Sequence, residues 1–383
     1  MPVEGVRRPA WAEISRPAIA HNVAALAQVL ESTQLCAVVK ANGYGHGAVL
    51  AAKAAMDGGA ASLAVAIVDE GIELRGAGVS APILLLAEIP ADTLPDALTH
   101  SLTLTIGSLE GARAARAAAE RLGGLHRVHL KIDTGMGRMG VTPADALEAA
   151  SILVGSSALD LEGVYTHFSV ADGSSPADRA FTAEQSARFD AVLGELADAG
   201  IAPRVVHAAN SAGALGHPAT RRDLARVGLA LYGYLPSAWL ADALAARGLD
   251  LQPALTLRAH VVAVRRAQAG ERPSYGRRRA LSAPATIATV PFGYADGYPR
   301  RLFDAGAEVL INGVRYPLAG NVTMDQLLID CGDDPVKVGD EVVLLGSQGP
   351  DAIWADDWAR WADTITWEIL CGIGARVPRV LVD

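Results

Sequence analysis

A regular alternation of two kinds of segment fills the first two-thirds of the chain, and it most constrains what this sequence can fold into. Short apolar runs rich in β-branched residues predict strands, and the Ala-rich stretches between them carry helix formers with polar faces. Strands that alternate with helices are typical of an α/β protein with a parallel sheet. We expect eight strands, at residues 35–40, 63–68, 83–87, 102–106, 128–133, 161–168, 205–208 and 224–229.

Eight such strand–helix units over about 230 residues match the size of a closed (β/α)8 TIM barrel. An open doubly wound sheet is the alternative, but no Gly-x-Gly-x-x-Gly fingerprint follows the first strand. Helices are expected between the strands, for example at 108–121, 143–154 and 182–199. The last of these opens with a capping-box pattern, in which Thr182 is the N-cap and Gln185 stands three residues later.

The pattern changes after residue 236, where shorter alternating strands and turns predict a second, mostly antiparallel β domain. Asn312 and Gly313 form the strongest hairpin signal in this region. A helix is expected at 355–362, with three Trp side chains at helical spacing that we interpret as core packing. We therefore expect two domains, a barrel at 1–240 and a β domain at 241–383. The β strands are expected at 256–264, 285–290, 308–311, 326–330 and 341–345.

Charge and cysteine content exclude several classes of protein. The 383 residues carry 42 acidic and 33 basic side chains, a net charge of −9, which argues against binding to nucleic acid or to an anionic membrane. Residues 1–13 have no apolar region typical of a signal peptide, and no apolar run is long enough to span a membrane. Cys36, Cys331 and Cys371 fit neither a disulfide framework nor a zinc site, so we expect a cytoplasmic protein without a metal.

Polar side chains stand where the predicted barrel strands end, which is where barrel enzymes carry their active sites. The first strand ends in Lys40, and a buried lysine readily loses its charge and becomes a nucleophile. The alternative is a lysine whose amine reaches solvent at the rim. The fifth strand carries Lys131 and Asp133 on one face, before a Gly-rich stretch that leads to Arg138. A salt-bridged layer of the barrel is the alternative for this pair.

The last three predicted strands add a candidate phosphate site. In barrels, phosphate groups often bind the loops after strands seven and eight. Asn210, Ser211 and the backbone amides of Gly228 and Leu229 fit such a site, whereas a lone histidine such as His167 is more often structural. A nucleophilic lysine beside a phosphate site suggests pyridoxal 5'-phosphate bound through a Schiff base.

Taken together, these segments resemble the alanine racemase family. Residues 37–47 (AVVKANGYGHG) closely resemble the cofactor-binding signature of that family. The resemblance extends over nearly the whole chain, and the order and spacing of its motifs make it specific. The other matching segments are 131–140 (KIDTGMGRMG), 163–168 (GVYTHF), 207–212 (HAANSA), 226–233 (RVGLALYG), 274–276 (SYG), 293–298 (GYADGY), 324–326 (MDQ) and 376–379 (RVPR).

The resemblance implies a pyridoxal phosphate-dependent isomerase that interconverts L- and D-alanine and supplies D-alanine for peptidoglycan. It also implies a homodimer with shared active sites and a small amino acid as substrate. Lys40 would carry the cofactor, Arg226 would face its pyridine nitrogen, and Lys131 would be carbamylated. Tyr275 would be the second base, supplied by the other subunit, and His167 would hydrogen-bond it. The remaining implied residues bind phosphate (Tyr44, Ser211, Gly228, Leu229) or the substrate (Arg138, Met324, Tyr294).

Three positions depart from the family pattern. Ala375 stands where some members have a phosphate-binding Tyr, Thr323 where a Cys is frequent, and Tyr298 where a Trp is frequent. Three other functions remain open at this stage: a broad-specificity or serine racemase, a non-catalytic pyridoxal phosphate-binding protein, and an amino-acid decarboxylase. Arg226 argues against the decarboxylase, and the β domain with Tyr275 argues against the binding protein.

Overall fold

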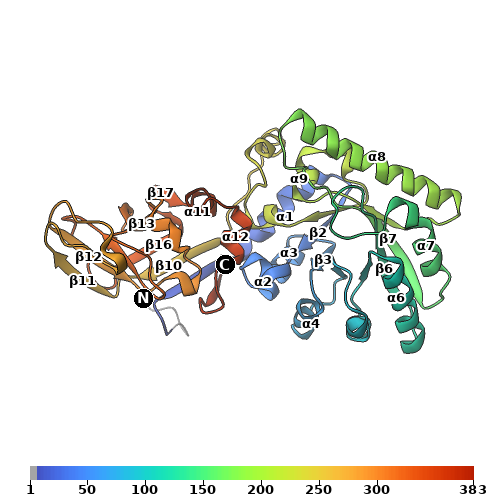
Figure 1. The fold of residues 1–383 in the computed structure, drawn as a ribbon, viewed down its shortest axis with the longest axis horizontal. Coiled ribbons are helices and arrows are strands. Elements are labelled where there is room, and N and C mark those ends of the chain that lie inside the picture. The colour runs from blue at the N-terminus through green and yellow to red at the C-terminus, as the bar shows by residue number, and fades with distance from the viewer. Residues whose placement is uncertain (1–6) are drawn as a thin grey trace. The chain divides into compact units, whose positions relative to one another are not determined.

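A computed structural model describes residues 7–383, which divide into two compact units (Figure 1). The barrel unit comprises Pro17–Gly43 and Ala48–Gln252. The β unit comprises the described residues up to Arg16, Tyr44–Gly47 and Pro253–Asp383. Residues 1–6 of the segment expected to lack a signal peptide lie outside the described residues. Each unit is described by itself.

Eight parallel strands form the centre of the barrel unit, in the order β4-β3-β2-β9-β8-β7-β6-β5. The two ends of this sheet meet, since Leu85 N donates to Thr103 O at 2.9 Å and Thr103 N donates to Ile83 O at 2.8 Å. The predicted eight-stranded barrel is thereby confirmed. The strands are β2 (Gln34–Val38), β3 (Ser62–Val65), β4 (Ile83–Leu85), β5 (Leu104–Ile106), β6 (His126–Lys131), β7 (Leu159–Tyr165), β8 (Val205–His207) and β9 (Leu224–Val227).

Helices follow the strands and surround the barrel (Figure 1). Ser108 caps α6 as its hydroxyl accepts from Gly111 N. Apart from Arg16 and Tyr44, which belong to the β unit, the helical segments of this unit are α1 (Arg16–Leu30), the left-handed turn α2 (Lys40–Tyr44), α3 (Ala48–Asp57), α4 (Val68–Gly76), α5 (Leu94–Thr99), α6 (Leu109–Leu122), α7 (Ala146–Val154), α8 (Pro176–Asp198), α9 (Ser211–Gly216) and α10 (Ala241–Ala245). Short 3-10 turns are η1 (Ala91–Thr93), η2 (Pro143–Asp145), η3 (Pro218–Thr220), η4 (Leu229–Tyr232) and η5 (Ala238–Leu240).

Several expected boundaries in the barrel are wrong, and two of the errors have clear local reasons. Helix α8 begins at Pro176, not at Thr182, because Ser175 and Asp178 form an earlier capping box with Pro at the first helical position. Thr182 lies inside the helix, where its hydroxyl donates to Asp178 O. Strand β3 ends at Val65, since the Glu70 carboxylate accepts from Ala66 N and starts α4.

The β unit contains a seven-stranded sheet, with the order β14-β13-β16-β10-β1-β18 and with β17 beside β16, and a three-stranded sheet, β11-β12-β15. Most pairs are antiparallel, as predicted, but β1 pairs parallel to β18. The expected strand 256–264 is two strands, because Val261 N binds Asp340 O while Val262 N binds Thr289 O in the other sheet. The strands are β1 (Ala10–Ser15), β10 (Leu255–His260), β11 (Ala263–Ala267), β12 (Ala285–Val290), β13 (Glu308–Ile311), β14 (Val314–Pro317), β15 (Leu327–Asp330), β16 (Glu341–Gln348), β17 (Asp351–Ile353) and β18 (Arg379–Val382).

The predicted hairpin and helix of this unit are both present. Asn312 (φ 53°) and Gly313 (φ 80°) connect β13 to β14. Helix α11 (Ala355–Ala362) is followed by α12 (Thr366–Cys371), and Trp358 is buried against the ring of Tyr298, with 4.5 Å between the ring centroids. The remaining turns are η6 (Tyr275–Arg277), η7 (Tyr294–Asp296) and η8 (Arg300–Phe303).

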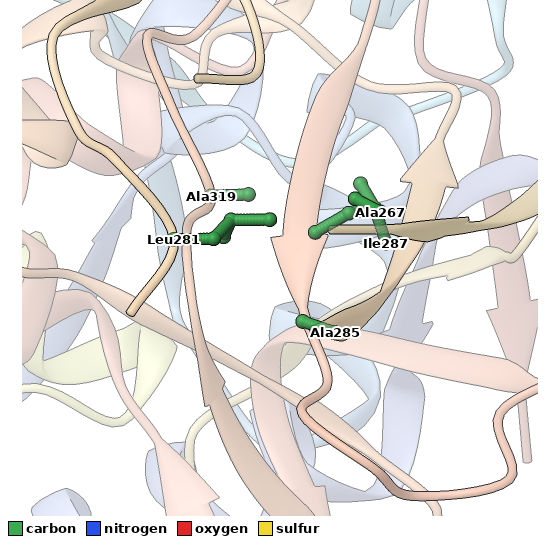
Figure 2. Close-up of a cluster of buried hydrophobic side chains, with 5 residues drawn as sticks. All are labelled: Ala267, Leu281, Ala285, Ile287 and Ala319. Carbon is green, nitrogen blue, oxygen red and sulfur yellow. The ribbon is translucent and has the colours of Figure 1, made fainter. Parts of the chain in front are cut away.

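The three-stranded sheet has a small hydrophobic core of its own (Figure 2). Leu328 of β15 packs against this core. The core therefore anchors both ends of the loop from β11 to β12, which contains η6 and Tyr275. Its buried members are Ala267, Leu281, Ala285, Ile287 and Ala319.

Candidate active site

Lys40 follows the carboxyl end of β2, where the backbone takes an unusual path. The next four residues, 41–44, all have φ between 51° and 61°. A left-handed conformation costs an L-residue roughly 1–2 kcal/mol, so a run of this length persists only where neighbouring groups hold it. Asn42 Oδ1 accepts from Ala48 N at 2.9 Å, and Ala41 N donates to the Glu70 carboxylate at 2.5 Å. This strained turn holds the half-buried Lys40 at the mouth of the barrel.

Arg226, on β9, is buried and donates to four acceptors of the barrel. Its Nη1 lies 2.7 Å from His207 Nδ1, and its Nη2 lies 2.8 Å from Thr166 O, 3.0 Å from Ala208 O and 3.2 Å from His167 Nδ1. Burial lowers the pKa of Arg226, yet a guanidinium keeps its charge at neutral pH. The barrel therefore holds a fixed cation in a defined orientation.

Lys131, at the end of β6, is buried with its amine 5.5 Å from the centre of the Tyr165 ring. Burial, together with the nearby charges of Arg226 and Arg138, lowers the pKa of Lys131 to about 8. A substantial fraction of its amine is therefore neutral, and so nucleophilic, just above neutral pH.

His167 lies after β7 beside the same cations. Its pKa is well below the ordinary value, because the ring is buried and because Arg226 and Lys131 oppose a further positive charge. His167 is therefore a neutral imidazole, which suits a hydrogen-bonding role rather than that of a cation.

The carboxylate of Asp133 binds the Gly-rich loop. Its Oδ1 accepts from Gly135 N at 2.9 Å and Met136 N at 2.8 Å, and its Oδ2 accepts from Gly137 N at 2.9 Å. Asp133 thus fixes the loop that ends in the exposed Arg138.

The loops after β8 and β9 meet at Ser211. Asn210 caps α9, with its Oδ1 accepting from Gly213 N at 2.9 Å, and Ser211 Oγ accepts from Gly228 N at 2.9 Å. Because Ser211 Oγ accepts this bond, its own proton remains available to an anion. This serine and the start of η4 at Leu229 form the candidate phosphate site of the barrel unit.

In the β unit, Tyr275 lies in η6 with 75% of its surface exposed. Ser274 has φ 68° and ψ 180°, a conformation that is costly for any residue except glycine. Two bonds hold this turn: Ser274 Oγ donates to Asn321 O at 2.6 Å, and Asn321 Nδ2 donates to Tyr275 O at 2.8 Å. The tyrosine is thus exposed while its backbone is fixed.

Tyr294 and Met324 lie on two segments that are bonded to each other. Tyr294 N donates to Thr323 O and Ala295 N donates to Met324 O, both at 3.0 Å. The buried Asp296 closes this turn, because its carboxylate accepts from Gly293 N at 2.9 Å and from Arg8 at 2.5 and 2.6 Å.

Tyr44 is buried in the β unit, and burial raises the pKa of its phenol well above the ordinary value. The hydroxyl therefore stays protonated and can donate a hydrogen bond to an anion.

Two family models account for most of the chain. Residues 14–236 match the model described as "Alanine racemase, N-terminal domain", and residues 254–381 match the model described as "Alanine racemase, C-terminal domain". The chain belongs to the alanine racemase family. The resemblance inferred from the sequence motifs is therefore confirmed.

Individual relatives agree with this assignment. An alanine racemase of Symbiobacterium thermophilum is 45% identical over 380 residues, which cover 99% of this chain and 98% of the relative. The crystal structure of an alanine racemase from a D-cycloserine-producing Streptomyces lavendulae has a TM-score of 0.91 at 38% identity, covering 99% of this chain and 98% of the other. The alanine racemase of E. faecalis has a TM-score of 0.89 at 40% identity and complete coverage of both chains.

Within the barrel unit, the alanine racemase fold brings most of the predicted residues to one end of the sheet. They follow the carboxyl ends of β2, β6, β7, β8 and β9, whereas Tyr44, Tyr275, Tyr294 and Met324 belong to the β unit. Sequence reasoning missed the supporting residues Arg8 and Asn321. No local pattern marks them, because their partners are hundreds or tens of positions away in the sequence.

Proposed function

We propose that this chain is an alanine racemase that interconverts L- and D-alanine, a small amino acid substrate. The observation that carries the proposal is the placement of an amine, a cation and an anion site on three neighbouring strands. Strand β2, which precedes Lys40, pairs with β9, which holds Arg226, and β9 pairs with β8, which leads to Ser211.

The alanine racemase family depends on pyridoxal phosphate, and the residues present fit this cofactor. Lys40 would hold it covalently, and Tyr44, Asn210, Ser211, Gly228 and Leu229 would bind its phosphate. When bound, the cofactor withdraws electrons from the α-carbon of the amino acid and makes the α-proton acidic. The proton of the Ser211 hydroxyl, whose oxygen accepts from Gly228 N, and the protonated phenol of Tyr44 match an acceptor with several oxygens.

Arg226 determines which reaction is favoured. A fixed cation facing the pyridine nitrogen keeps that nitrogen unprotonated, and this limits electron withdrawal into the ring. Simple proton exchange is then favoured over decarboxylation, so the decarboxylase alternative is disfavoured. The four acceptors of Arg226 are two carbonyl oxygens and two imidazole nitrogens, which agrees with this role.

Two bases on opposite faces of the α-carbon would complete the racemisation. Lys40 would remove the proton from D-alanine and Tyr275 from L-alanine, with the neutral His167 hydrogen-bonded to the tyrosine hydroxyl. The 75% exposure of Tyr275 supports a partner subunit, because proton transfer to a buried carbon requires an enclosed base. We therefore propose a homodimer whose active sites are shared.

Further residues would bind the substrate carboxylate and limit its size. Arg138 and the backbone of Met324 would bind the carboxylate, and Tyr294 would restrict the entrance to small side chains. The pKa of Lys131, lowered to about 8, supports carbamylation, since only the neutral amine reacts with carbon dioxide. A carbamate at this position would be an anion able to orient Arg138. Ala375 has no hydroxyl, so the phosphate contact made by a tyrosine in some relatives should be absent.

The cellular context is part of the same proposal. D-alanine would be supplied for cell-wall peptidoglycan. No helix within residues 7–383 is long and apolar enough to cross a membrane. The buried thiols of Cys36 and Cys331 are in no disulfide bond, which supports the reducing environment of the cytoplasm.

The test is an assay of the purified protein with its cofactor. We expect a pyridoxal imine absorbance band and a loss of optical rotation from L-alanine, both abolished in Lys40→Ala. A higher kcat/KM for serine or for larger amino acids would favour the broad-specificity alternative. Cofactor binding without any racemisation would favour the non-catalytic binding protein.

A further inference from the structure

A line of hydrogen-bonded side chains leads from Arg226 to His207 on β8, and from there to β6 and β7. His207 Nε2 lies 2.8 Å from His129 Nδ1, and His129 Nε2 lies 3.3 Å from Glu162 Oε2. Arg226, His207 and His129 are buried, whereas the side chain of Glu162 is 19% exposed. These four residues form a hydrogen-bonded relay from the barrel mouth to a carboxylate that the proposed chemistry does not use.

The two ends of the relay determine the direction of every bond. An arginine can only donate hydrogen bonds, and an ionised carboxylate can only accept them. His207 Nδ1 must therefore accept from Arg226, so the proton of His207 is on Nε2 and points to His129 Nδ1. His129 then also carries its proton on Nε2 and donates it to Glu162. Both imidazoles are neutral and in the same tautomer.

Other protonation states conflict with this geometry. A second proton on His129 Nδ1 would oppose the His207 N–H at 2.8 Å, and one on His207 Nδ1 would oppose Arg226 at 2.7 Å. Burial and Arg226 also hold the pKa of His207 well below its ordinary value. Glu162 stays ionised, since the hydrogen bond from His129 lowers its pKa and since Arg127 Nε lies 3.5 Å away.

Packing fixes the two rings in place. The ring of Tyr165 stacks on His207 with 4.5 Å between centroids and 11° between planes. Residue 163 is a glycine, and any Cβ there would lie 2.7 Å from His129 Cε1. The His129 ring therefore packs directly against the backbone of residue 163 and the His207 ring against Tyr165, so packing restrains both rings in addition to their hydrogen bonds.

We propose that Glu162 is a positioning residue that acts on Arg226 through His129 and His207. Its carboxylate fixes the tautomers of both histidines, and these hold the guanidinium in the orientation that faces the cofactor. The role in racemisation rests on the proposed function, whereas the tautomers depend on the barrel unit alone.

The nearby Asp160 offers a matched control. It lies on the same strand as Glu162, and its side chain is also 19% exposed. Both carboxylates lie near Arg204, which is 2.7 and 3.0 Å from Asp160 and 3.7 Å from Glu162. The structure gives Asp160 no hydrogen bond to either histidine of the relay. Asp160→Asn therefore removes the same charge from the same cluster and leaves the relay intact.

The first measurement is the ring nitrogen spectrum of the cofactor-free protein labelled with nitrogen-15 in histidine. Signals of His129 and His207 can be assigned by single substitution of each. We expect both rings in the neutral Nε2–H form at neutral pH. An Nδ1–H form or a doubly protonated ring at either position would overturn the proposal.

The second measurement compares variants of the holoenzyme. Glu162→Leu should lower kcat on the order of tenfold with KM unchanged, as is common when the partner of an orienting histidine is removed. Glu162→Gln, whose amide oxygen can still accept from His129, should recover most of the loss, and Asp160→Asn should match the wild type. Equal losses in Glu162→Leu and Asp160→Asn would refute the relay. If the wild type racemises no amino acid, the proposed function fails, and the nitrogen spectra still decide whether the relay exists.

Discussion

Arg226 in the barrel unit is buried and donates to four acceptors, whereas Tyr275 in the β unit is 75% exposed and is held through its backbone by Asn321. The barrel unit thus encloses the Arg226 guanidinium with residues of the same unit. The Tyr275 turn instead combines a costly backbone conformation at Ser274 with an exposed side chain. The difference shows two ways of fixing a group: side-chain hydrogen bonds hold the Arg226 guanidinium itself, whereas backbone bonds hold only the turn that carries the exposed Tyr275 side chain.

The largest expected effect is in the barrel half. Lys40→Ala should lose both covalent cofactor and one base, so activity should fall by more than the ~10⁴-fold upper range for a single acid–base group. The measurement is kcat/KM together with borohydride labelling of the wild type. Labelling of a lysine other than Lys40 would contradict this assignment.

Mixing two inactive variants tests whether the halves come from different subunits. Lys40→Ala and Tyr275→Phe should each be nearly inactive, yet hybrid dimers would contain one intact site. Random reassociation should therefore restore about a quarter of wild-type activity. No recovery, in a mixture shown by mass spectrometry to contain hybrids, would mean that each site is built from one chain.

A smaller effect is expected from the support of the Tyr275 turn. Asn321→Ala removes the bond to Tyr275 O, which contributes roughly 0.5–1.5 kcal/mol, so kcat should fall by a few-fold to about tenfold. Ser274→Gly should cost less, because glycine adopts φ 68° without strain. If Ser274→Gly is the more damaging of the two, the turn is held mainly by the serine hydroxyl.

A separate prediction concerns stability and Lys131. The pKa of Lys131 is about 8 in the folded protein, against an ordinary value of 10.5. Between pH 8 and pH 10.5 the unfolded chain therefore binds more protons at this residue than the folded protein does. In bicarbonate-free buffer, the free energy of unfolding should therefore rise from about pH 8 to about pH 10.5 relative to that of Lys131→Met. Urea titrations of both cofactor-free proteins across this range provide the measurement. Parallel pH profiles would show that Lys131 titrates normally.

Carbamylation can be followed in the same two proteins. With carbon-13 bicarbonate, the wild type should show a carbamate signal that Lys131→Met lacks. A free amine, or a bound halide ion at this place in a crystal, would contradict the proposed modification.

Local pattern predicted the elements whose cause is local. Strands β12 and β13 and helix α11 were expected at the residues where they occur. Their signals are local: apolar alternation in β12, the Asn-Gly turn directly after β13, and the helical spacing of the Trp residues in α11. Strand β1 was not expected, because it is stabilised by pairing with β10 and β18, which are more than 240 positions away. Lys40 was expected as the last residue of a strand, but β2 ends at Val38, and the bond from Ala41 to Glu70 helps to turn the chain just after Lys40.

The same distinction applies to the site. The residues at the ends of the barrel strands could be predicted, because the fold itself brings strand ends together. Glu162 could not, since its role depends on side-chain contacts among three strands and on a glycine that admits a histidine ring. Such contacts depend on the register of the strands, which no local pattern in the sequence specifies.

The assignment of Lys40 and Tyr275 to opposite faces of the α-carbon is tested most directly by solvent deuterium exchange at the α-carbon of each enantiomer, in single turnover, with Tyr275→Ala. Exchange with D-alanine should survive, because Lys40 is intact. Exchange with L-alanine should fall by the ~10²–10⁴-fold that a positioned acid–base group supplies, and racemisation should fall with it. Equal losses for both enantiomers would show that Tyr275 acts on binding or on the cofactor, and a loss for D-alanine alone would reverse the assignment of the two faces.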